Sequence, residues 1–357
     1  MTSQMLVPGE WRGSPEEFPA VKGYEWIAKL PTNKKIYLSM WSAWHSSDLP
    51  ADYDYYIVSY HLEAVNLPWL QQQAAQINKP IIVLFDGNSY DTVIPNVHFI
   101  PYYYWHEQLE QLIRWFGIKE KHIPEYKFSA VCNRVTQSKV WTTTKLLETA
   151  RATSLIVLNS WLDEKNVHSW QPTGNSKLDQ LSTVFQNKYQ GKTIKIDDFD
   201  NDSMNQQRIT GNPWQPLIDN VAINFTNESF HYSLMMDPDR YIWPGPFLTE
   251  KTLKCLVGGT TFIPVGQFET YHTLSQLGLE FDYGFDISWD TDPGNLSRAA
   301  SIIDLIDHLN QYDITKLVEL TQASSKFNQN WIVTGQFAQQ CQRRNQESTE
   351  KIFEIIG

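Results

Sequence analysis

Short apolar segments alternate with polar segments through the first third of the chain. The apolar segments are bounded by turn residues and predict strands at residues 35–40, 55–60, 81–85 and 97–101. Residues 67–77 (LPWLQQQAAQI) predict a crossover helix ahead of Pro80, and residues 108–116 predict another helix. Strands separated by helices are typical of a parallel sheet that is covered on both faces.

The same alternation restarts after the polar segment 117–126, which contains Pro124. We predict further strands at 127–133, 154–161, 220–226 and 261–265, helices at 138–150, 248–257 and 271–277, and mainly helix beyond Ser297. Residues 163–215 are rich in Asp, Asn, Gln and Ser and predict an irregular insert with one helix at 178–189. The pattern therefore predicts two α/β domains, residues 1–124 and residues 125–357, the second ending in helices.

The composition supports two folded domains and narrows the class of protein. A length of 357 residues with 41% hydrophobic residues is enough for two cores, and 19% charged residues excludes a disordered chain. No apolar run approaches the roughly 18 residues of a membrane span, and the N-terminus lacks the basic start and apolar stretch of a secretory signal. We expect a soluble, cytoplasmic protein; the oligomeric state stays open.

The charge and the cysteines weigh against two further classes. The net charge of −11 is spread along the chain, which weighs against non-specific binding to a nucleic-acid backbone. Cys132, Cys255 and Cys341 are widely spaced without a CxxC pair, so we expect reduced thiols and no structural zinc site.

The segment from Asn224 to Gly266 carries the strongest chemical signal. It runs from a strand through a polar loop to Thr249-Glu250-Lys251, which predict the start of a helix with Thr249 as its N-cap, and it ends in a buried strand. In an open α/β sheet, ligands bind at the carboxyl ends of strands beside helix N-termini that favour anions. A lysine and a carboxylate there can bind a diphosphate and a ribose. The alternative is that Glu250 complements the helix dipole and Lys251 is a solvated charge.

The order of these pieces resembles the donor-binding motif of fucosyltransferase-like and exostosin-like glycosyltransferases, and especially the glycosyltransferase-like proteins of phages and large viruses. The matching residues are Phe225 to Ser229 (FTNES), Phe247 to Lys251 (FLTEK), Gly258 to Gly266 (GGTTFIPVG) and Leu277 to Phe281 (LGLEF) with the later Phe285-Asp286 and Trp289-Asp290. The resemblance covers roughly residues 125–310. The loop from Phe230 to Pro246 is longer than the spacing in fucosyltransferases.

The resemblance implies a GT-B architecture, in which two Rossmann-like domains with parallel sheets face each other across a cleft. It implies that Glu250 bonds the ribose hydroxyls and that Lys251 neutralises the leaving diphosphate, in place of a metal ion. Its implied co-substrate is a UDP- or GDP-linked sugar, with no separate cofactor. Arg240 is then a second cation, and Glu228 and Ser229 lie near the sugar or the ribose.

Other residues complete the candidate site. Arg134 follows the strand at 127–133, where the resemblance places donor phosphates, and its alternative is a surface arginine in a βα loop. An inverting enzyme needs a base that accepts the proton of the acceptor hydroxyl. Asp86 at the end of strand 81–85 is the first candidate, with His45 and His61 as rivals, and each of the three also has a structural interpretation.

Two acidic pairs raise the alternative of a metal site. Asp237-Pro238-Asp239 and Asp290-Thr291-Asp292 have the spacing of a metal-binding DxD motif, but no apolar strand precedes the first. We interpret the first pair as solvated turn acids and expect no metal site. The chain also lacks a P-loop, a GxGxxG and a GxSxG motif, which weighs against kinases, dehydrogenases and α/β-hydrolases.

Aromatic residues gather at 101–106 (PYYYWH) and 40–45 (MWSAWH), where they either stack on a sugar or base or pack in the core.

The sequence thus predicts a glycosyltransferase that moves a sugar from a nucleotide sugar to a hydroxyl, in the host cytoplasm if a phage encodes it. The acceptor alternatives are a hydroxymethylated pyrimidine in phage DNA and a glycan or lipopolysaccharide. Two other classes stay open, a non-catalytic nucleotide-sugar-binding protein and a structural phage protein.

Overall fold

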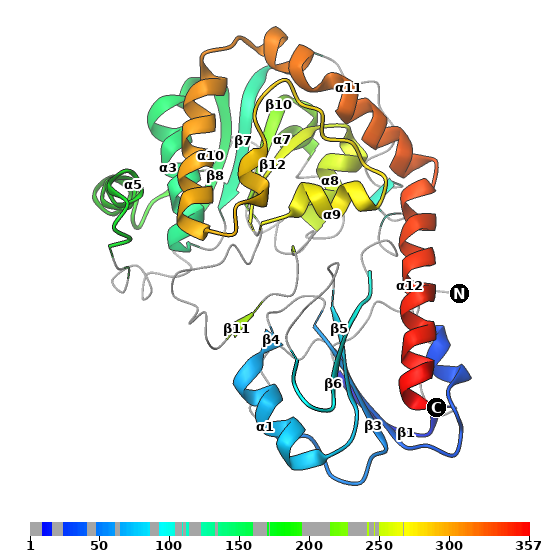
Figure 1. Cartoon of the computed structure of the whole chain (residues 1–357). Helices are drawn as coiled ribbons and strands as arrows, with labels where there is room; N and C mark the ends of the chain where they lie inside the picture. Colours follow the sequence, from blue (N-terminus) through cyan, green and yellow to red (C-terminus); the bar gives the residue numbers. More distant parts are fainter. Residues whose placement is uncertain are drawn as a thin grey trace. The chain divides into compact units, whose positions relative to one another are not determined.

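A computed structural model gives the architecture of the chain (Figure 1). It describes residues 9–15, 24–40, 48–60, 65–85, 93–103, 109, 112–113, 123–132, 135–159, 170, 172–194, 215–227, 241–242, 246, 250–266 and 268–357. These residues form an α/β structure with two five-stranded sheets and one two-stranded sheet. The α/β class predicted from the sequence is therefore confirmed.

The chain divides into two compact units. Unit 1 comprises Met1–Glu107, Met236–Phe247 and Ala338–Gly357, and unit 2 comprises Gln108–Met235 and Leu248–Phe337. The division predicted from the sequence placed everything after residue 124 in one domain. The units differ from it because two later segments belong with the N-terminal part of the chain.

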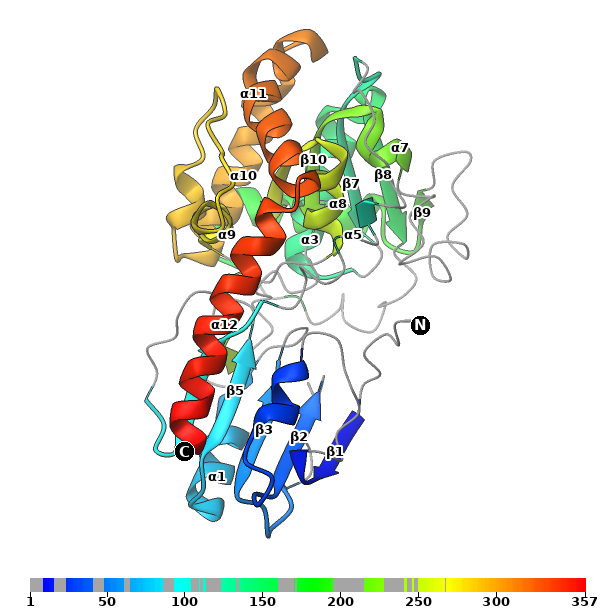
Figure 2. The same ribbon diagram turned by 90° about the vertical axis from the view of Figure 1, so that its right-hand side faces the viewer.

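Unit 1 is built on a mainly parallel sheet in the order β1-β2-β3-β5-β6. Its strands are β1 (Gly9–Gly13), β2 (Ile36–Met40), β3 (Tyr55–Ser59), β5 (Ile81–Phe85) and β6 (Val97–Pro101). The neighbours β2, β3, β5 and β6 are parallel, whereas β1 pairs with β2 in antiparallel fashion (Figure 2). The other elements are the 3₁₀ helix η2 (Glu25–Lys29), the helix α1 (Leu67–Ile77), and the antiparallel pair β4 (Val65–Asn66) and β11 (Tyr241–Ile242).

The alternation of side chains along β3 separates two hydrophobic clusters. Tyr55 and Ile57 belong to a cluster that includes η2, whereas Tyr56 and Val58 belong to a cluster that includes α1. Every residue of β3 is buried. The sheet of unit 1 is thus covered on both faces, which explains why its central strands are continuous apolar runs rather than alternating ones.

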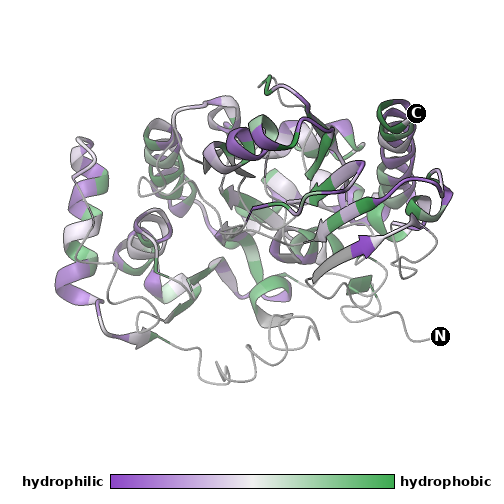
Figure 3. Ribbon diagram, turned by 90° about the horizontal axis from the view of Figure 1, so that it is seen from below, coloured by the Kyte–Doolittle hydropathy of each residue, from purple (hydrophilic) through white to green (hydrophobic). Residues whose placement is uncertain are grey.

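The last helix of the chain covers one face of this sheet. Helix α12 (Gln336–Ile356) places Ile352 and Ile356 in the cluster of Tyr55 and Ile57, and the Tyr55 hydroxyl donates to the Ile356 carbonyl at 2.6 Å. Figure 3 shows hydrophobic and hydrophilic residues on different sides of this C-terminal helix. Burial of two isoleucine side chains contributes about 1.5–3 kcal/mol each. The C-terminus is therefore part of the core of unit 1.

Unit 2 contains a second sheet in the order β12-β10-β7-β8-β9. The strands β7 (Tyr126–Cys132), β8 (Ser154–Asn159), β10 (Val221–Asn227) and β12 (Thr261–Val265) are parallel to their neighbours, and β9 (Thr193–Ile194) is antiparallel to β8. The strands predicted at 127–133, 154–161, 220–226 and 261–265 are confirmed to within a few residues. Because β7, β8, β10 and β12 are parallel, their carboxyl ends lie at one edge of the sheet.

Helices lie on either side of this sheet (Figure 1). The first layer contains α3 (Gln137–Thr149), α5 (Ser176–Lys188) and α10 (Asn295–Asn310), and the second contains α8 (Glu250–Gly258), α9 (Thr270–Gln276) and α11 (Ile314–Val333). Shorter elements are α7 (Gln215–Asp219) and the 3₁₀ helices η3 (Arg151–Thr153) and η6 (Ser288–Thr291). This arrangement of helices on both faces of a mainly parallel sheet is compatible with a Rossmann-like unit.

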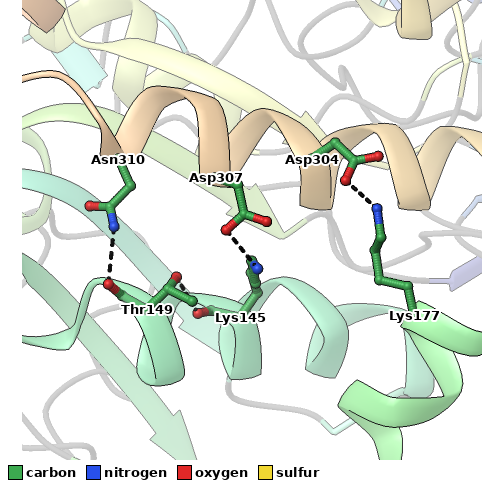
Figure 4. Close-up of polar contacts among 6 residues, drawn as sticks. All are labelled: Lys145, Thr149, Lys177, Asp304, Asp307 and Asn310. Atoms are coloured by element: carbon green, nitrogen blue, oxygen red, sulfur yellow. Dashed lines mark hydrogen bonds and ion pairs between the residues drawn. The ribbon is translucent and has the colours of Figure 1, made fainter.

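Polar contacts attach α10 to its neighbours (Figure 4). Asp307 forms an ion pair with Lys145 of α3 at 2.6 Å, Asp304 contacts Lys177 of α5, and the Asn310 amide donates to the Thr149 carbonyl at 3.0 Å. Both aspartates are well exposed, so the ion pairs contribute little stability. The apolar face of α10, with Ile302, Ile303 and Ile306 buried, does most to hold this helix in place.

Candidate functional site

Strand β10 carries polar side chains into the interior of unit 2. All of its residues are buried, and Asn224, Thr226 and Asn227 are 6, 2 and 3% exposed. A central strand of a covered parallel sheet is ordinarily apolar, because each buried polar group costs free energy unless it is hydrogen-bonded. Three such polar residues toward the carboxyl end of β10 therefore mark this part of the strand as a candidate functional site.

A small hollow lies between the end of β10 and helix α8. Among the described residues its lining comprises Val131, Ile218, Asn224, Phe225, Thr226, Asn227, Lys251 and Cys255. Its enclosed volume is about 10 Å³, roughly what one water molecule needs. A larger ligand therefore meets the hollow at its rim, where Asn227 ends its strand and Lys251 lies in the first turn of its helix.

The side-chain amide of Asn227 forms a hydrogen bond through its nitrogen, whereas its oxygen has no hydrogen-bond partner among the described residues. Its Nδ2 donates to the carbonyl of Val131 on the neighbouring strand at 3.0 Å, which orients the amide. Its Oδ1 is buried and has no hydrogen-bond partner within the described part of the chain. Buried polar atoms are nearly always paired, so an unpaired one calls for an explanation. The orientation makes Oδ1 a fixed acceptor at the hollow.

Lys251 brings a positive charge to the same place. Helix α8 begins at Glu250, and the half-buried side chain of Lys251 lines the hollow from its first turn. The N-terminus of a helix carries a partial positive charge, which adds to the positive field of Lys251. The end of β10 and the start of α8 thus provide an acceptor and a cation to the same hollow.

The other predicted site residues are placed only in part. Glu250 is the first residue of α8, and its side chain is outside the described residues. The remaining candidates also lie outside them: Thr249, Arg240, Arg134, Glu228, Ser229, Asp86 and His45, together with the rival base His61 and the pair Asp237 and Asp239. Lys251 lines the same hollow as Asn227, a residue of the quoted motif for which we predicted no role. Its signal in the sequence was a polar residue at the end of a predicted strand.

A second lysine lies at the same edge of the sheet. Lys139 is in the first turn of α3, directly after β7, and is 5% exposed. Burial raises the pKa of Cys132, the last residue of β7, to about 11, while the charge of Lys139 acts in the opposite direction. The Cys132 thiol is therefore protonated at neutral pH and is a packing residue rather than a nucleophile.

Asp290, the first acid of the second DxD pair, is a buried helix cap. Asp290 is 2% exposed, and its carboxylate accepts from the backbone N–H groups of Thr270 at 3.0 Å, Tyr271 at 2.9 Å and His272 at 3.3 Å. It therefore caps α9 from a position 20 residues later in the chain. Burial raises its pKa to about 6, although the three N–H groups and Arg298 favour the ionised form.

Arg298 completes this buried polar group. Its guanidinium is 1% exposed and donates to the carbonyl of Gly266 at 3.1 Å, to the carbonyl of Asp292 at 2.7 Å and to Asn295 Oδ1 at 2.7 Å. Burial lowers its pKa to about 10, and the charges of Asp290 and Asp292 oppose that shift. Arg298 thus fixes the end of β12, the strand beside β10.

The LGLEF motif has a structural explanation in this chain. Gly278 has φ +89°, and a Cβ there would come within 2.5 Å of the Trp331 ring. Leu279 and Phe281 are buried, and Phe281 packs against Tyr271 and Phe262 at ring-centroid distances of 4.6 and 5.9 Å. This part of the motif therefore builds the core of unit 2 behind β12 rather than lining the hollow.

The aromatic segment 101–106 is also partly explained by packing. Tyr102 and Tyr103 are 3 and 7% exposed, and Tyr102 packs with Tyr24 and Trp26 in the core of unit 1. For these two residues the interpretation as an open aromatic wall is wrong. Residues 104–106 and 41–45 lie outside the described part.

Comparisons with protein-family models and with curated proteins find no match for the chain. Among the described residues, no group of three or more His, Cys, Asp or Glu side chains comes together as a metal site, and no helix has the length and apolar character needed to cross a bilayer. None of the three cysteines forms a disulfide.

Proposed function

We propose that the protein is a glycosyltransferase of the GT-B type that binds a nucleotide sugar at the carboxyl end of β10 and transfers its sugar to an acceptor hydroxyl. The observation that carries the proposal is that Asn227 and Lys251 line the same hollow: the buried Asn227 Oδ1 has no hydrogen-bond partner among the described residues, and Lys251 brings a cation from the first turn of a helix. Two α/β units are compatible with this class of enzyme.

The polarity of the rim matches the two ends of a nucleotide sugar. Lys251 and the N-terminus of α8 favour the negative charge of a diphosphate. The Asn227 Oδ1 accepts hydrogen bonds only, so it repels phosphate oxygens and binds a hydroxyl or an N–H group, such as those of a ribose or a base. The hollow has room for about one water-sized group, so a single hydroxyl or N–H group of the ligand enters it and the rest of the ligand lies outside.

The chemistry follows from the charge that develops as the sugar leaves. Cleavage of the bond between the anomeric carbon and the diphosphate transfers the bonding electrons to the leaving oxygen, and the Lys251 ammonium stabilises that oxygen. The acceptor hydroxyl forms the new bond and gives up its proton to a base. Glu250 is the proposed ligand of the ribose hydroxyls, and Asp86 and His45 are the proposed bases, in line with the resemblance of the TEK segment.

A thermal-shift panel of UDP-, GDP- and CDP-sugars with their nucleoside diphosphates tests the proposal. We expect one nucleotide to raise the melting temperature of the wild type and neither Lys251→Ala nor Asn227→Ala to respond to it. Release of nucleoside diphosphate in the presence of an acceptor then separates a transferase from a protein that only binds. A wild type that no nucleotide stabilises contradicts the proposal.

A further inference from the structure

A continuous chain of buried hydrogen bonds links α7, the sheet and α8 in unit 2. Ser129 of β7 donates to the Leu217 carbonyl at 2.7 Å, Asn224 Nδ2 donates to Ser129 Oγ at 2.7 Å, and Thr226 Oγ1 donates to Asn224 Oδ1 at 2.8 Å. The chain ends at Cys255 of α8, whose Sγ lies 3.8 Å from Thr226 Oγ1. All four side chains are at least nine-tenths buried.

The direction of each bond follows from the number of protons available. The Asn224 amide oxygen only accepts, so the single hydroxyl proton of Thr226 points to it. The Thr226 oxygen then accepts from the thiol S–H of Cys255. The network therefore runs in one direction, from the thiol on α8 to the carbonyl of Leu217 on α7.

The end of this network lies on the helix face that carries Lys251. Residues four apart on a helix are neighbours on one face, and Lys251 and Cys255 both line the hollow. A fixed Cys255 limits the rotation of α8 about its axis and its distance from β10. Both quantities determine where Lys251 lies relative to Asn227, which is the residue after Thr226 on β10.

We infer that Thr226 is a positioning residue, which aligns Lys251 with the amide of Asn227 by holding Cys255 against β10. The identity of the ligand in this inference rests on the proposed function. The alignment of Lys251 with Asn227 does not depend on that function. Fully satisfied buried networks specify one arrangement of the elements they join, whereas a broken one leaves costly unpaired groups.

The test compares two threonine variants that each lose one buried hydroxyl bond. Thr226→Val breaks the network at its centre, and Thr261→Val removes the 2.7 Å bond between Thr261 and Ser325, which lies outside the hollow. In wild type and variants we measure the dissociation constants of UDP and GDP by calorimetry and the acetylation rate of Lys251 by acetic anhydride and peptide mass spectrometry.

We expect Thr226→Val to weaken nucleotide binding about tenfold, the effect of one buried hydrogen bond, and to change the acetylation rate of Lys251. Thr261→Val lowers the melting temperature but leaves the dissociation constants and the acetylation rate of Lys251 at their wild-type values. Thr226→Ser, which keeps the hydroxyl, also leaves both at their wild-type values. Cys255→Ala has the effect of Thr226→Val, and the double variant is no weaker than either single one.

The acetylation rate of Lys251 distinguishes a failure of the proposed function from a failure of the inference about Thr226. If wild type binds neither nucleotide but Thr226→Val still changes the reactivity of Lys251, the proposed function fails and the alignment stands. If Thr226→Val acetylates and binds like the wild type, or if Thr261→Val has the same effects as Thr226→Val, the inference is overturned.

Discussion

The side chain of Asn345 forms two hydrogen bonds with the backbone of Tyr103, a residue 242 positions earlier in the chain. Tyr103 N–H donates to Asn345 Oδ1 at 2.7 Å, and Asn345 Nδ2 donates to the Tyr103 carbonyl at 2.8 Å. The amide thus imitates a strand partner just beyond the end of β6. Ser348, one turn further along α12, donates to the Pro101 carbonyl.

Asn345→Ala is expected to destabilise unit 1 by about 1–3 kcal/mol, because it leaves two buried backbone groups of Tyr103 unpaired. Urea denaturation followed by fluorescence measures the loss. Gln346→Ala is the control, since Gln346 on the same helix is exposed and contacts Glu350. Equal midpoints for the two variants would show that α12 does not stabilise unit 1 through this pair.

The burial of Asp290 predicts a particular dependence of stability on pH. Its pKa is raised to about 6 in the folded protein, so the folded state takes up a proton that the unfolded chain does not between about pH 4 and 6. The stability contributed by this group is present below pH 4 and is lost as the pH rises through 6.

Asp290→Asn therefore removes part of the loss of stability between about pH 4 and 6. The expected difference between wild type and variant in this loss is on the order of 1–3 kcal/mol over this range. Denaturation midpoints at several pH values, for wild type and variant side by side, measure it. Parallel curves would show that Asp290 does not titrate in this range.

Two glycines with positive φ provide a matched test of close packing. Gly278 (φ +89°) faces the Trp331 ring, whereas Gly174 (φ +78°) has open space around it. Gly174→Ala is expected to cost about 1–2 kcal/mol for its backbone conformation alone. Gly278→Ala adds a steric clash of about 1–3 kcal/mol more. Melting temperatures compare the two, and equal losses would contradict the packing explanation.

The sequence predicted the strands better than the contacts between distant segments. Continuous apolar runs such as Ile81–Phe85 and Thr261–Val265 gave strands with the observed bounds, because buried parallel strands leave a local signal. The pattern of α12 predicted a helix but not the sheet that it covers, since periodicity contains no information about the partner. The edge strand β1 was missed because GEWRG is short and polar.

For the candidate site too, the sequence predicted the features that depend on neighbouring residues. Thr249-Glu250-Lys251 predicted a helix start, and α8 begins there. The role of Asn227 depends on the carbonyl of Val131, 96 residues earlier, and the capping role of Asp290 was not predicted because the N–H groups that it caps lie about 20 residues away. A single acidic residue in a loop shows no sequence signal for such a partner.

The most direct test of the account is the binding of nucleoside diphosphates by calorimetry to wild type, Lys251→Ala and Lys316→Ala. Lys316 also lies in the first turn of a helix, α11, but is exposed and pairs with Glu319. We predict that wild type and Lys316→Ala bind one of UDP or GDP equally and that Lys251→Ala binds it at least about tenfold more weakly. Binding that is unchanged in Lys251→Ala would contradict the account.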